Sequence, residues 1–566
     1  MFIYLILILY FKLINIYFFN SIYNYQLLNY FYSELSNMFN NQNSLFAANS
    51  NNSNDQDTIM EAKFQNRQDA FLNEENFTDL KETEMKKEYR LGQNVREKIF
   101  IQKRIKMSIN SEQNQSLKSK LTISKELYEN CEKMSVDLYK FNDIIQAFRT
   151  QDINQKYTGL VGIRKLLSLQ NSPIQELIDQ GIVPELISLL DNSPAEFQYE
   201  ALWCLTNIAT GTSDQANNIV VKGGIPKIIK LLDSSIEELK IQSTWLLGNL
   251  SSDCLKIRDT LIKEKAFDKL VTIIFSTTNP QLIKQGTWAL SNFFRIRPKP
   301  PFDAVSKCLN VVARAMNIMS KNKDNEFLAD ACFILYFMTE FYKETIKDLF
   351  DLNLIPQILS NLEVDNKFIL INCLRIVGNI ASGNANQTQK LLDFGALNYL
   401  KKTIFSQHKQ IRKETAWILS NIAAGTQKQI ETLIAEDILP ILDRVIKSDE
   451  PEIKKECIWA VCNLTSVENI QYIEKILKQG ILRIICDCLR LDDAKYLAVC
   501  LEAFGNLLAF GKKSVQGTNS PNPIVEEVDK MGMFDVLEKL QLHPVEIVYE
   551  KTLKILENYF ETQNVE

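Results

Sequence analysis

Apolar side chains recur with the three-to-four-residue spacing of amphipathic helices from about residue 141 to residue 561. Short apolar segments such as residues 225–232 alternate with longer ones that end in an N-I-A-x-G turn, as at residues 207–211 and 379–383. We expect the glycine of each turn to supply a left-handed helix stop, and the Ser, Thr or Asp after it to cap the next helix. Prolines recur near the start of the short apolar helix, where a missing N–H is tolerated: Pro184, Pro226, Pro356 and Pro440. The pattern predicts an all-α chain built from three-helix units.

A tryptophan and an asparagine four residues later recur in the third helix of most units. The steps between successive tryptophans are 42, 43, 129 and 42 residues, and 129 spans three units. The pairs are Trp203/Asn207, Trp245/Asn249, Trp288/Asn292, Trp417/Asn421 and Trp459/Asn463, with Phe333/Phe337 and Arg375/Asn379 at the two intermediate positions. A helical period of about 40–47 residues is typical of armadillo and HEAT arrays. We therefore expect residues 141–561 to form a right-handed superhelical solenoid of about ten three-helix armadillo repeats, irregular at both ends.

Residues four apart lie on one face of a helix, so stacking equivalent helices aligns the pairs into a ladder. A single tryptophan usually indicates burial. Here, however, all five tryptophans occupy one phase of the repeat, and an unpaired carboxamide in an apolar core would cost about 1–3 kcal/mol. We interpret the ladder as a surface for an extended peptide with cationic side chains, whose stems and charges the indoles attract by about 0.5–2 kcal/mol each. Asp253, Asp330 and Glu456 would read the charge.

Charge and composition narrow the function further. The 566 residues carry a net charge of −5 with a pI near 5.6, which argues against general nucleic-acid binding and is compatible with a basic protein partner. The eleven cysteines and two histidines show no metal-ligand spacing, so we expect reduced, mostly buried cysteines, no metal and no cofactor. No phosphate-binding glycine loop or nucleophile elbow is present, so we expect no enzymatic activity.

The first residues differ from the rest of the chain. Residues 1–19 are long and apolar enough for a membrane anchor, but Lys12 and Asn15 interrupt them and no basic cluster flanks them. Their composition is the one that A/T-rich codons encode. We expect upstream non-coding sequence read as protein, with translation starting at Met38 or Met60, and a membrane anchor is the alternative.

The remaining N-terminal segments differ in composition. The extension of residues 1–59 becomes Asn/Ser-rich after residue 38, which predicts disorder. Residues 60–110 alternate acidic and basic side chains, as a solvated charged helix does. Residues 111–140 are expected to be a linker to the repeats.

The most specific stretches are residues 197–215 (FQYEALWCLTNIATGTSDQ), 287–295 (TWALSNFFR), 298–305 (PKPPFDAV), 373–384 (CLRIVGNIASGN) and 414–426 (ETAWILSNIAAGT). With these stretches the chain resembles importin-α (karyopherin-α) over about residues 60–561. The resemblance implies an adaptor that binds Lys/Arg-rich nuclear localisation signals in an armadillo groove and links their cargo to importin-β. It also implies an export receptor that recycles the adaptor, and shuttling between cytoplasm and nucleus. No direct nucleic-acid or membrane contact is expected.

The resemblance also implies which residues bind. Tryptophans would form slots, asparagines would hold the peptide backbone, and Asp253 with the Gly211 carbonyl would hold the key lysine. The major site would comprise Trp203, Asn207, Gly211, Gln242, Trp245, Asn249, Asp253, Gln285, Trp288 and Asn292. The minor site would comprise Asp330, Phe333, Arg375, Asn379, Thr388, Glu414, Trp417, Ser420, Asn421, Glu456, Trp459 and Asn463. The importin-β-binding arm in residues 60–110 would use Lys86, Lys87, Arg90, Arg96, Lys98, Lys103, Arg104 and Lys106.

Three features depart from the family pattern. The arm is poor in arginine, Phe333 replaces a tryptophan, and Ala216 stands where the family usually has a threonine near the key lysine. The alternative function is an armadillo scaffold of junctional or vacuolar type, with or without a membrane anchor. A complete Trp/Asn ladder together with Asp253 favours the adaptor.

Overall fold

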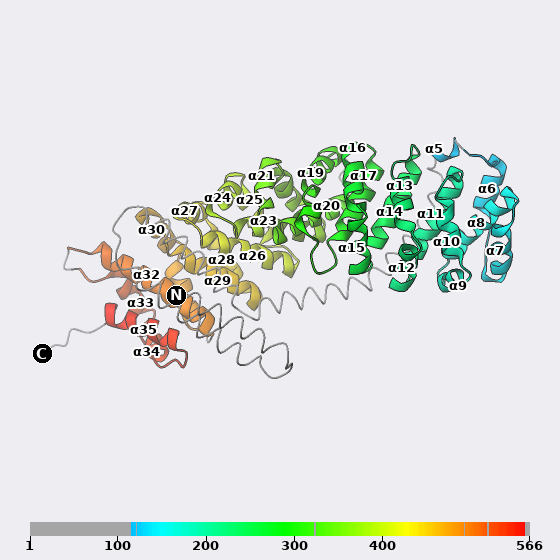
Figure 1. Ribbon diagram of the computed structural model, residues 1–566. Coiled ribbons are helices and arrows are strands. Elements are labelled where there is room, and N and C mark those ends of the chain that lie inside the picture. Colours follow the sequence, from blue (N-terminus) through cyan, green and yellow to red (C-terminus); the bar gives the residue numbers. More distant parts are fainter. Residues whose placement is uncertain (1–114, 120, 322–323, 492, 518–519, 561–566) are drawn as a thin grey trace, which may run out of the picture. The chain divides into compact units, whose positions relative to one another are not determined.

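Figure 1 shows the computed structural model, which describes residues 115–119, 121–321, 324–491, 493–517 and 520–560. Within these ranges the chain is entirely helical and contains no strand. The extension of residues 1–59 and the basic arm of residues 60–110 lie outside the described residues, so the expectations for them stay predictions.

Nine complete repeats of three helices follow one another in the described residues. The first helices are α9 (Ile174–Asp179), α12 (Ser213–Val221), α15 (Leu255–Lys263), α18 (Phe302–Val305), α21 (Thr345–Asp351), α24 (Ala385–Asp393), α27 (Gln427–Ala435), α30 (Ile470–Lys478) and α33 (Pro523–Lys530). The second helices are α10 (Ile182–Leu189), α13 (Gly224–Leu231), α16 (Ala266–Ser276), α19 (Cys308–Met319), α22 (Ile355–Ser360), α25 (Ala396–Thr403), α28 (Ile438–Ser448), α31 (Ile481–Leu489) and α34 (Met533–Leu540). The third helices are α11 (Ala195–Ile208), α14 (Glu237–Ser251), α17 (Pro280–Phe293), α20 (Asn325–Phe341), α23 (Lys367–Ala381), α26 (Lys409–Ala423), α29 (Pro451–Leu464), α32 (Ala494–Ser514) and α35 (Glu546–Tyr559).

An irregular first repeat precedes these nine. It consists of α6 (Lys125–Lys133), the 3-10 helix η2 (Leu138–Lys140), α7 (Phe141–Arg149) and α8 (Ile153–Leu167), and a second 3-10 helix, η3 (Asn361–Glu363), follows α22. With this repeat the array has the ten units that the period predicts.

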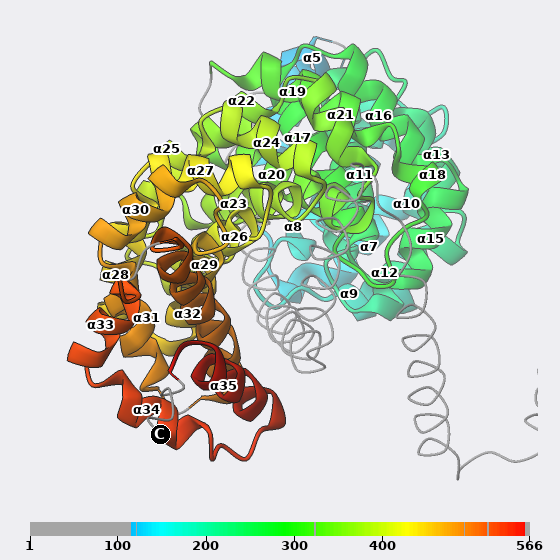
Figure 2. The same cartoon turned by 90° about the vertical axis from the view of Figure 1, so that its left-hand side faces the viewer.

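Neighbouring repeats share one continuous apolar core. Each third helix packs against the third helices before and after it, from α8 through to α35, and Figures 1 and 2 show this succession in sequence order. The buried aliphatic and aromatic side chains of all repeats form a single cluster. A repeat of this size buries its apolar face only on its neighbours. The armadillo array predicted from the spacing is confirmed.

The turns use glycine differently from the prediction. Gly211 and Gly383 do not have a positive φ, so they are not left-handed helix stops. A Cβ on either one would lie 2.1 or 2.3 Å from the Oε1 atom of Gln215 or Gln387. These glutamines close the capping boxes that start α12 and α24, so the glycines are needed for close approach. Five of the six left-handed glycines of the described residues instead join first to second helices, at Gly181, Gly223, Gly395, Gly480 and Gly532. The sixth, Gly517, follows the third helix α32.

Part of the segment expected to be a linker is helical and packs on the repeats. Helix α5 (Gln115–Lys118) contacts α14, and Leu117 is fully buried there. The Leu117 N–H donates to Glu238 Oε1 at 3.3 Å, and the Thr122 N–H donates to Glu196 Oε1 at 2.9 Å. Two carboxylates at the start of α14 and α11 therefore hold Leu117 and Thr122 against the array.

Two further observations bear on the expected class of protein. None of the helices that the structure describes has the length and hydropathy to cross a lipid bilayer. All eleven cysteines of the chain are unpaired, and ten of them are buried. Burial raises the pKa of several of these thiols, Cys308 and Cys457 among them, which makes them poor nucleophiles.

Candidate peptide-binding ladder

The Trp/Asn pairs lie on consecutive third helices, as the period predicts. Helices α11, α14 and α17 carry the first three pairs, α26 and α29 carry the last two, and α20 and α23 carry the two exceptions. Each of these helices packs on the next, so the pairs are brought onto neighbouring rungs. Trp203 is 2% exposed, whereas Trp245, Trp288, Trp417 and Trp459 are half-buried. Four of the five indoles thus combine a packed edge with an accessible part.

Two of the indole rings pack directly on a glycine of the preceding third helix. A Cβ on Gly248 would lie 2.3 Å from the Cζ3 atom of Trp288, and a Cβ on Gly378 would lie 2.1 Å from the same atom of Trp417. No larger residue fits beneath either ring without moving it. The two glycines therefore fix the height of the rings on the ladder.

The asparagines of the major site are tied to the helix before them. Asn249 Nδ2 donates to Thr206 O at 3.2 Å, and Asn292 Nδ2 donates to Gly248 O at 3.0 Å. Asn207 Nδ2 makes the equivalent bond to Ser168 Oγ at 3.3 Å. These three carboxamides are only 1–3% exposed. These hydrogen bonds offset the free-energy cost of burying the asparagine side chains. They also orient the amide oxygens, such as Asn249 Oδ1, which has no partner among the described residues.

Asp253 follows α14 and carries a buried carboxylate oxygen that no described residue satisfies. Its Oδ2 atom has no hydrogen-bond partner in the part of the chain that the structure describes. A buried carboxylate oxygen without a donor is costly, so the site favours an incoming cation or N–H donor. Ala216, at the neighbouring family threonine position, is fully buried and offers no hydroxyl.

The other residues predicted for the major site have defined contacts. Gln242 is buried, and its Nε2 atom donates to Thr206 Oγ1 at 2.9 Å. Gln285 is half-buried, and its Nε2 atom has no partner among the described residues. Gly211 packs on the capping box of α12. Of these three, Gln285 has the side-chain donor best placed to serve a ligand.

Only some of the side chains predicted for the minor site are accessible to a ligand. Ser420 Oγ donates to Glu456 Oε2 at 3.0 Å, which orients that carboxylate. Thr388 is buried, and its hydroxyl donates at 3.3 Å to Ala381 O, at the end of α23 in the preceding repeat. On the last two rungs, Asn421 and Asn463 are half-buried, and Asn421 Nδ2 has no partner in the described residues. Thr388 is therefore a packing residue in this structure.

Two minor-site acids are paired with arginines of the chain itself. Arg375 Nε contacts Glu414 Oε1 at 3.0 Å. Arg295 Nη2 contacts Asp330 Oδ1 at 3.2 Å, and its guanidinium lies 4.5 Å from the centre of the Phe333 ring. The position where a peptide cation was expected at Phe333 thus already holds a guanidinium. Asn379, four residues after Arg375 on α23, contacts the Thr339 hydroxyl at 3.0 Å.

A third arginine lies beneath the first tryptophan. The Arg164 guanidinium is 4.3 Å from the centre of the Trp203 ring and contacts Glu200 at 2.6 Å and Glu132 at 2.5 Å. Burial raises the pKa of Glu200 to about 7, although Arg164 opposes this shift. Burial alone would lower the pKa of Arg164, but the two carboxylates raise it above its usual value.

The sequence analysis missed Arg164, Arg295 and Glu200. Arg164 precedes Trp203 by 39 residues, close to the ladder period, and Ser168 follows it by four as each asparagine follows its tryptophan. Glu200 precedes Trp203 by three residues, as Glu456 precedes Trp459. Extending the period one step toward the N-terminus would therefore have found Arg164, and the spacing of Glu456 and Trp459 would have found Glu200.

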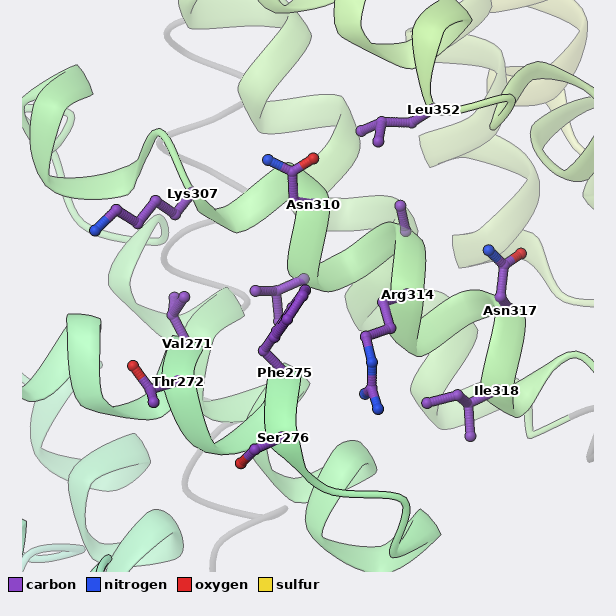
Figure 3. Close-up of a pocket in the computed structure, with 12 residues that line it drawn as sticks. Val271, Thr272, Phe275, Ser276, Lys307, Asn310, Arg314, Asn317, Ile318 and Leu352 are labelled. Atoms are coloured by element: carbon purple, nitrogen blue, oxygen red, sulfur yellow. The ribbon is translucent and has the colours of Figure 1, made fainter.

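A cavity of about 880 Å³ lies between the second helices α16 and α19. Figure 3 shows Phe275 near its centre, with Lys307, Asn310 and Arg314 around it. It contains no ladder residue. It is separate from the candidate site.

Comparisons with known proteins agree with this arrangement. Residues 170–210, 212–252 and 426–466 match the armadillo/beta-catenin-like repeat, and residues 522–566 match the atypical Arm repeat. Importin subunit alpha-3 of Arabidopsis thaliana is 37% identical over 75% of this chain and 80% of that protein. Importin subunit alpha-1b of Oryza sativa subsp. japonica is 34% identical over 74% of this chain and 78% of that protein. Importin subunit alpha-B of Dictyostelium discoideum is 37% identical over 73% of this chain and 81% of that protein. The solved structure of an engineered protein aligns with a TM-score of 0.60 at 22% identity, over 74% of this chain and 98% of that chain, which shows a shared fold.

Proposed function

This chain belongs to the importin-α family, and on that premise we propose that it is a nuclear-import adaptor for Lys/Arg-rich nuclear localisation signals. The signal binds along the ladder as an extended peptide, and the adaptor links its cargo to importin-β. The family is one of transport adaptors without enzymatic activity, the class that the sequence predicts for this chain.

The observation that carries the proposal is the Asp253 carboxylate. Its Oδ2 atom is buried without a hydrogen-bond partner among the described residues. A lysine ammonium group of a bound peptide would supply the missing donor. Trp245 lies on the same helix, α14, and Trp288 lies on the next third helix. Indole faces attract the stem and charge of a basic side chain. An anionic acceptor at the end of α14, together with the indoles of α14 and α17, therefore favours a basic peptide.

The expected partners follow from the same family. Importin-β would take the charged arm of residues 60–110, and an export receptor would return the adaptor from the nucleus to the cytoplasm. The arm and the ladder belong to one chain, so basic residues of the arm compete with cargo at high effective concentration until importin-β removes them. The chain's net charge of −5 supports association with basic partners.

Peptide binding to the full chain tests the proposal. A fluorescently labelled PKKKRKV peptide is titrated with the protein, and anisotropy is compared with that of PKTKRKV, in which one lysine is replaced. We expect binding of PKKKRKV at low-micromolar concentration or below, and its loss in PKTKRKV. Equal affinity of the two peptides, or no binding of either, would overturn the proposal.

A further inference from the structure

The cavity of about 880 Å³ between the second helices α16 and α19 has a lining unlike that of the ladder. Phe275 of α16 lies near its centre in Figure 3, and this side chain is 53% exposed. Val311, Ile318 and Leu352 are among the other apolar residues that line it. The neutral polar lining residues are Thr272, Ser276, Asn310 and Asn317. A concave, mostly apolar surface with a few polar groups is the usual form of a binding site.

The cavity lies where an ion pair of the two preceding interfaces is replaced by apolar side chains. In those interfaces an aspartate after one second helix contacts a lysine on the next second helix, 36 residues later. The two pairs are Asp191–Lys227, at 2.9 Å, and Asp233–Lys269, at 2.5 Å. The step from one pair to the next is 42 residues, and the same step leads on to Phe275 and Val311. These two side chains form no ion pair, so a binding surface takes the place of a polar bridge.

Both charged residues that line the cavity are cations, Lys307 and Arg314, and none of its lining residues is acidic. Arg314 Nη1 donates to Ile274 O at 3.2 Å and to Thr277 O at 3.0 Å, which fixes the guanidinium 5.4 Å from the centre of the Phe275 ring. Lys307 immediately precedes α19 and is exposed. Figure 3 shows the two cations on either side of Phe275. In a chain with a net charge of −5, this surface is locally positive.

We propose that this cavity is a docking site for an acidic segment of a partner protein. A phenylalanine or leucine of that segment packs on Phe275 and Val311, and its neighbouring carboxylates pair with Lys307 and Arg314. The same two cations repel the Lys/Arg-rich signals proposed for the ladder. The inference goes beyond the proposed function and does not depend on it. The repeats would hold a basic partner on their third helices and an acidic partner on their second helices.

Peptide titrations with the full chain test the inference. The probe is a fluorescently labelled EEDFDELFEE peptide, compared with EEDSDESSEE, in which serines replace the apolar residues. Phe275→Asp restores the acidic residue of the two preceding interfaces and places a charge of the wrong sign in the cavity. Because Phe275 is exposed, this substitution should leave the fold intact.

Phe405→Asp is the matched control. Phe405 follows the second helix α25 and is 41% exposed. Its ring lies 4.6 Å from the Arg444 guanidinium, a contact that resembles that of Phe275 with Arg314, and Arg444 likewise follows its phenylalanine by 39 residues. Phe405 does not line the cavity. The control therefore makes the same chemical change on another part of the second-helix surface.

We expect the wild-type chain to bind EEDFDELFEE at least about tenfold more tightly than EEDSDESSEE, because the apolar side chains anchor the segment. Phe275→Asp should weaken binding of EEDFDELFEE about tenfold or more, and Phe405→Asp should leave its Kd within about twofold of wild type. Lys307→Glu is the second variant if thermal melting shows that Phe275→Asp is unfolded, and it should weaken binding about fivefold. No binding of either peptide, equal affinity for both peptides, or equal losses in the two phenylalanine variants would overturn the inference.

Acidic residues of the chain itself are the other occupant that the test must separate. Residues 74–84 read EENFTDLKETE and lie outside the described residues. In a variant with Phe77→Ser and Leu80→Ser, the Kd of EEDFDELFEE should stay at the wild-type value. A clearly tighter Kd would show that this segment competes for the cavity, and would overturn the assignment to a partner protein. Failure of the proposed function is read separately, since it appears as a loss of PKKKRKV binding on the same samples.

Discussion

Replacing Asp253 by asparagine tests the observation on which the proposed function depends. The substitution keeps the shape of the side chain and removes its charge. In the free protein the Oδ2 atom has no partner among the described residues, so no internal bond to that atom is broken. The substitution should therefore change ligand binding and leave the stability of the fold almost unaffected.

The expected size of the effect follows from the type of bond lost. A hydrogen bond to a charged group contributes about 1.5–3 kcal/mol, and one between an ammonium group and a neutral amide oxygen contributes less. The net loss of binding free energy in Asp253→Asn is therefore about 1.4–2 kcal/mol, which weakens binding of PKKKRKV about ten- to thirtyfold. Asp253→Lys adds repulsion and should abolish binding. The free energy of unfolding should stay within about 1 kcal/mol of wild type, because a costly unsatisfied carboxylate is removed.

Anisotropy titrations and urea denaturation measure the two quantities on the same samples. Asp268→Asn is the matched control: Asp268 lies on α16, a second helix, and pairs with Lys265 at 3.5 Å. This control removes the same charge from the neighbouring repeat and should leave the Kd within about twofold of wild type. Unchanged binding in Asp253→Asn, or an equal loss in both variants, would refute the assignment of Asp253 as the lysine acceptor.

Three further perturbations follow from the structure. Trp245→Ala combined with Asn249→Ala should weaken binding of single-cluster signals while the helical circular dichroism persists; a large loss of helical signal would instead identify the pair as core residues. Gly248→Ala places a Cβ 2.3 Å from the Trp288 ring and should weaken peptide binding, whereas Gly505→Ala, whose Cβ would meet nothing closer than 4.0 Å, should not; equal Kd values for both variants and wild type would contradict the role of Gly248. The pKa of Glu200 is raised to about 7, so the folded state binds the extra proton between about pH 4.5 and pH 7, and the free energy of unfolding should fall as pH rises through this window by up to about 3 kcal/mol. Urea denaturation at pH 5 and pH 7.5 should show this decrease in wild type and a smaller one in Glu200→Gln; identical pH dependence in both would exclude Glu200 as its source.

The repeat architecture could be predicted from the sequence because it depends on local and periodic signals. A helical period near 42 residues, and pairs such as Trp245/Asn249 at a constant phase, place equivalent residues on one face whatever the detailed packing. The turn glycines were assigned wrongly for a local reason. A glycine after a helix is compatible both with a left-handed stop and with close packing on a capping side chain, and Gly211 does the second.

Contacts between repeats could not be predicted in the same way. Whether Arg295 contacts Asp330, 35 residues away, depends on how α17 and α20 pack and on the direction of two long side chains. The ties from Asn249 and Asn292 to the preceding helix likewise require the helix register. The sequence predicts which residues share the ladder, and only the packing shows which of them are already occupied.

The attachment of Leu117 and Thr122 to the array also limits how far the basic arm can reach. Leu117 is bonded to Glu238 of α14, the helix that carries Trp245. Lys106 precedes Gln115 by nine residues, and nine peptide units span at most about 30 Å in any conformation. Packed helices lie about 8–10 Å apart, so this segment reaches α11, α14 and α17. Helix α26 is four third helices beyond α14 and about 32–40 Å away, at or beyond the limit of this segment. Chain length therefore favours the first site for the basic residues nearest the attachment point, whereas those earlier in the arm have reach enough for the second.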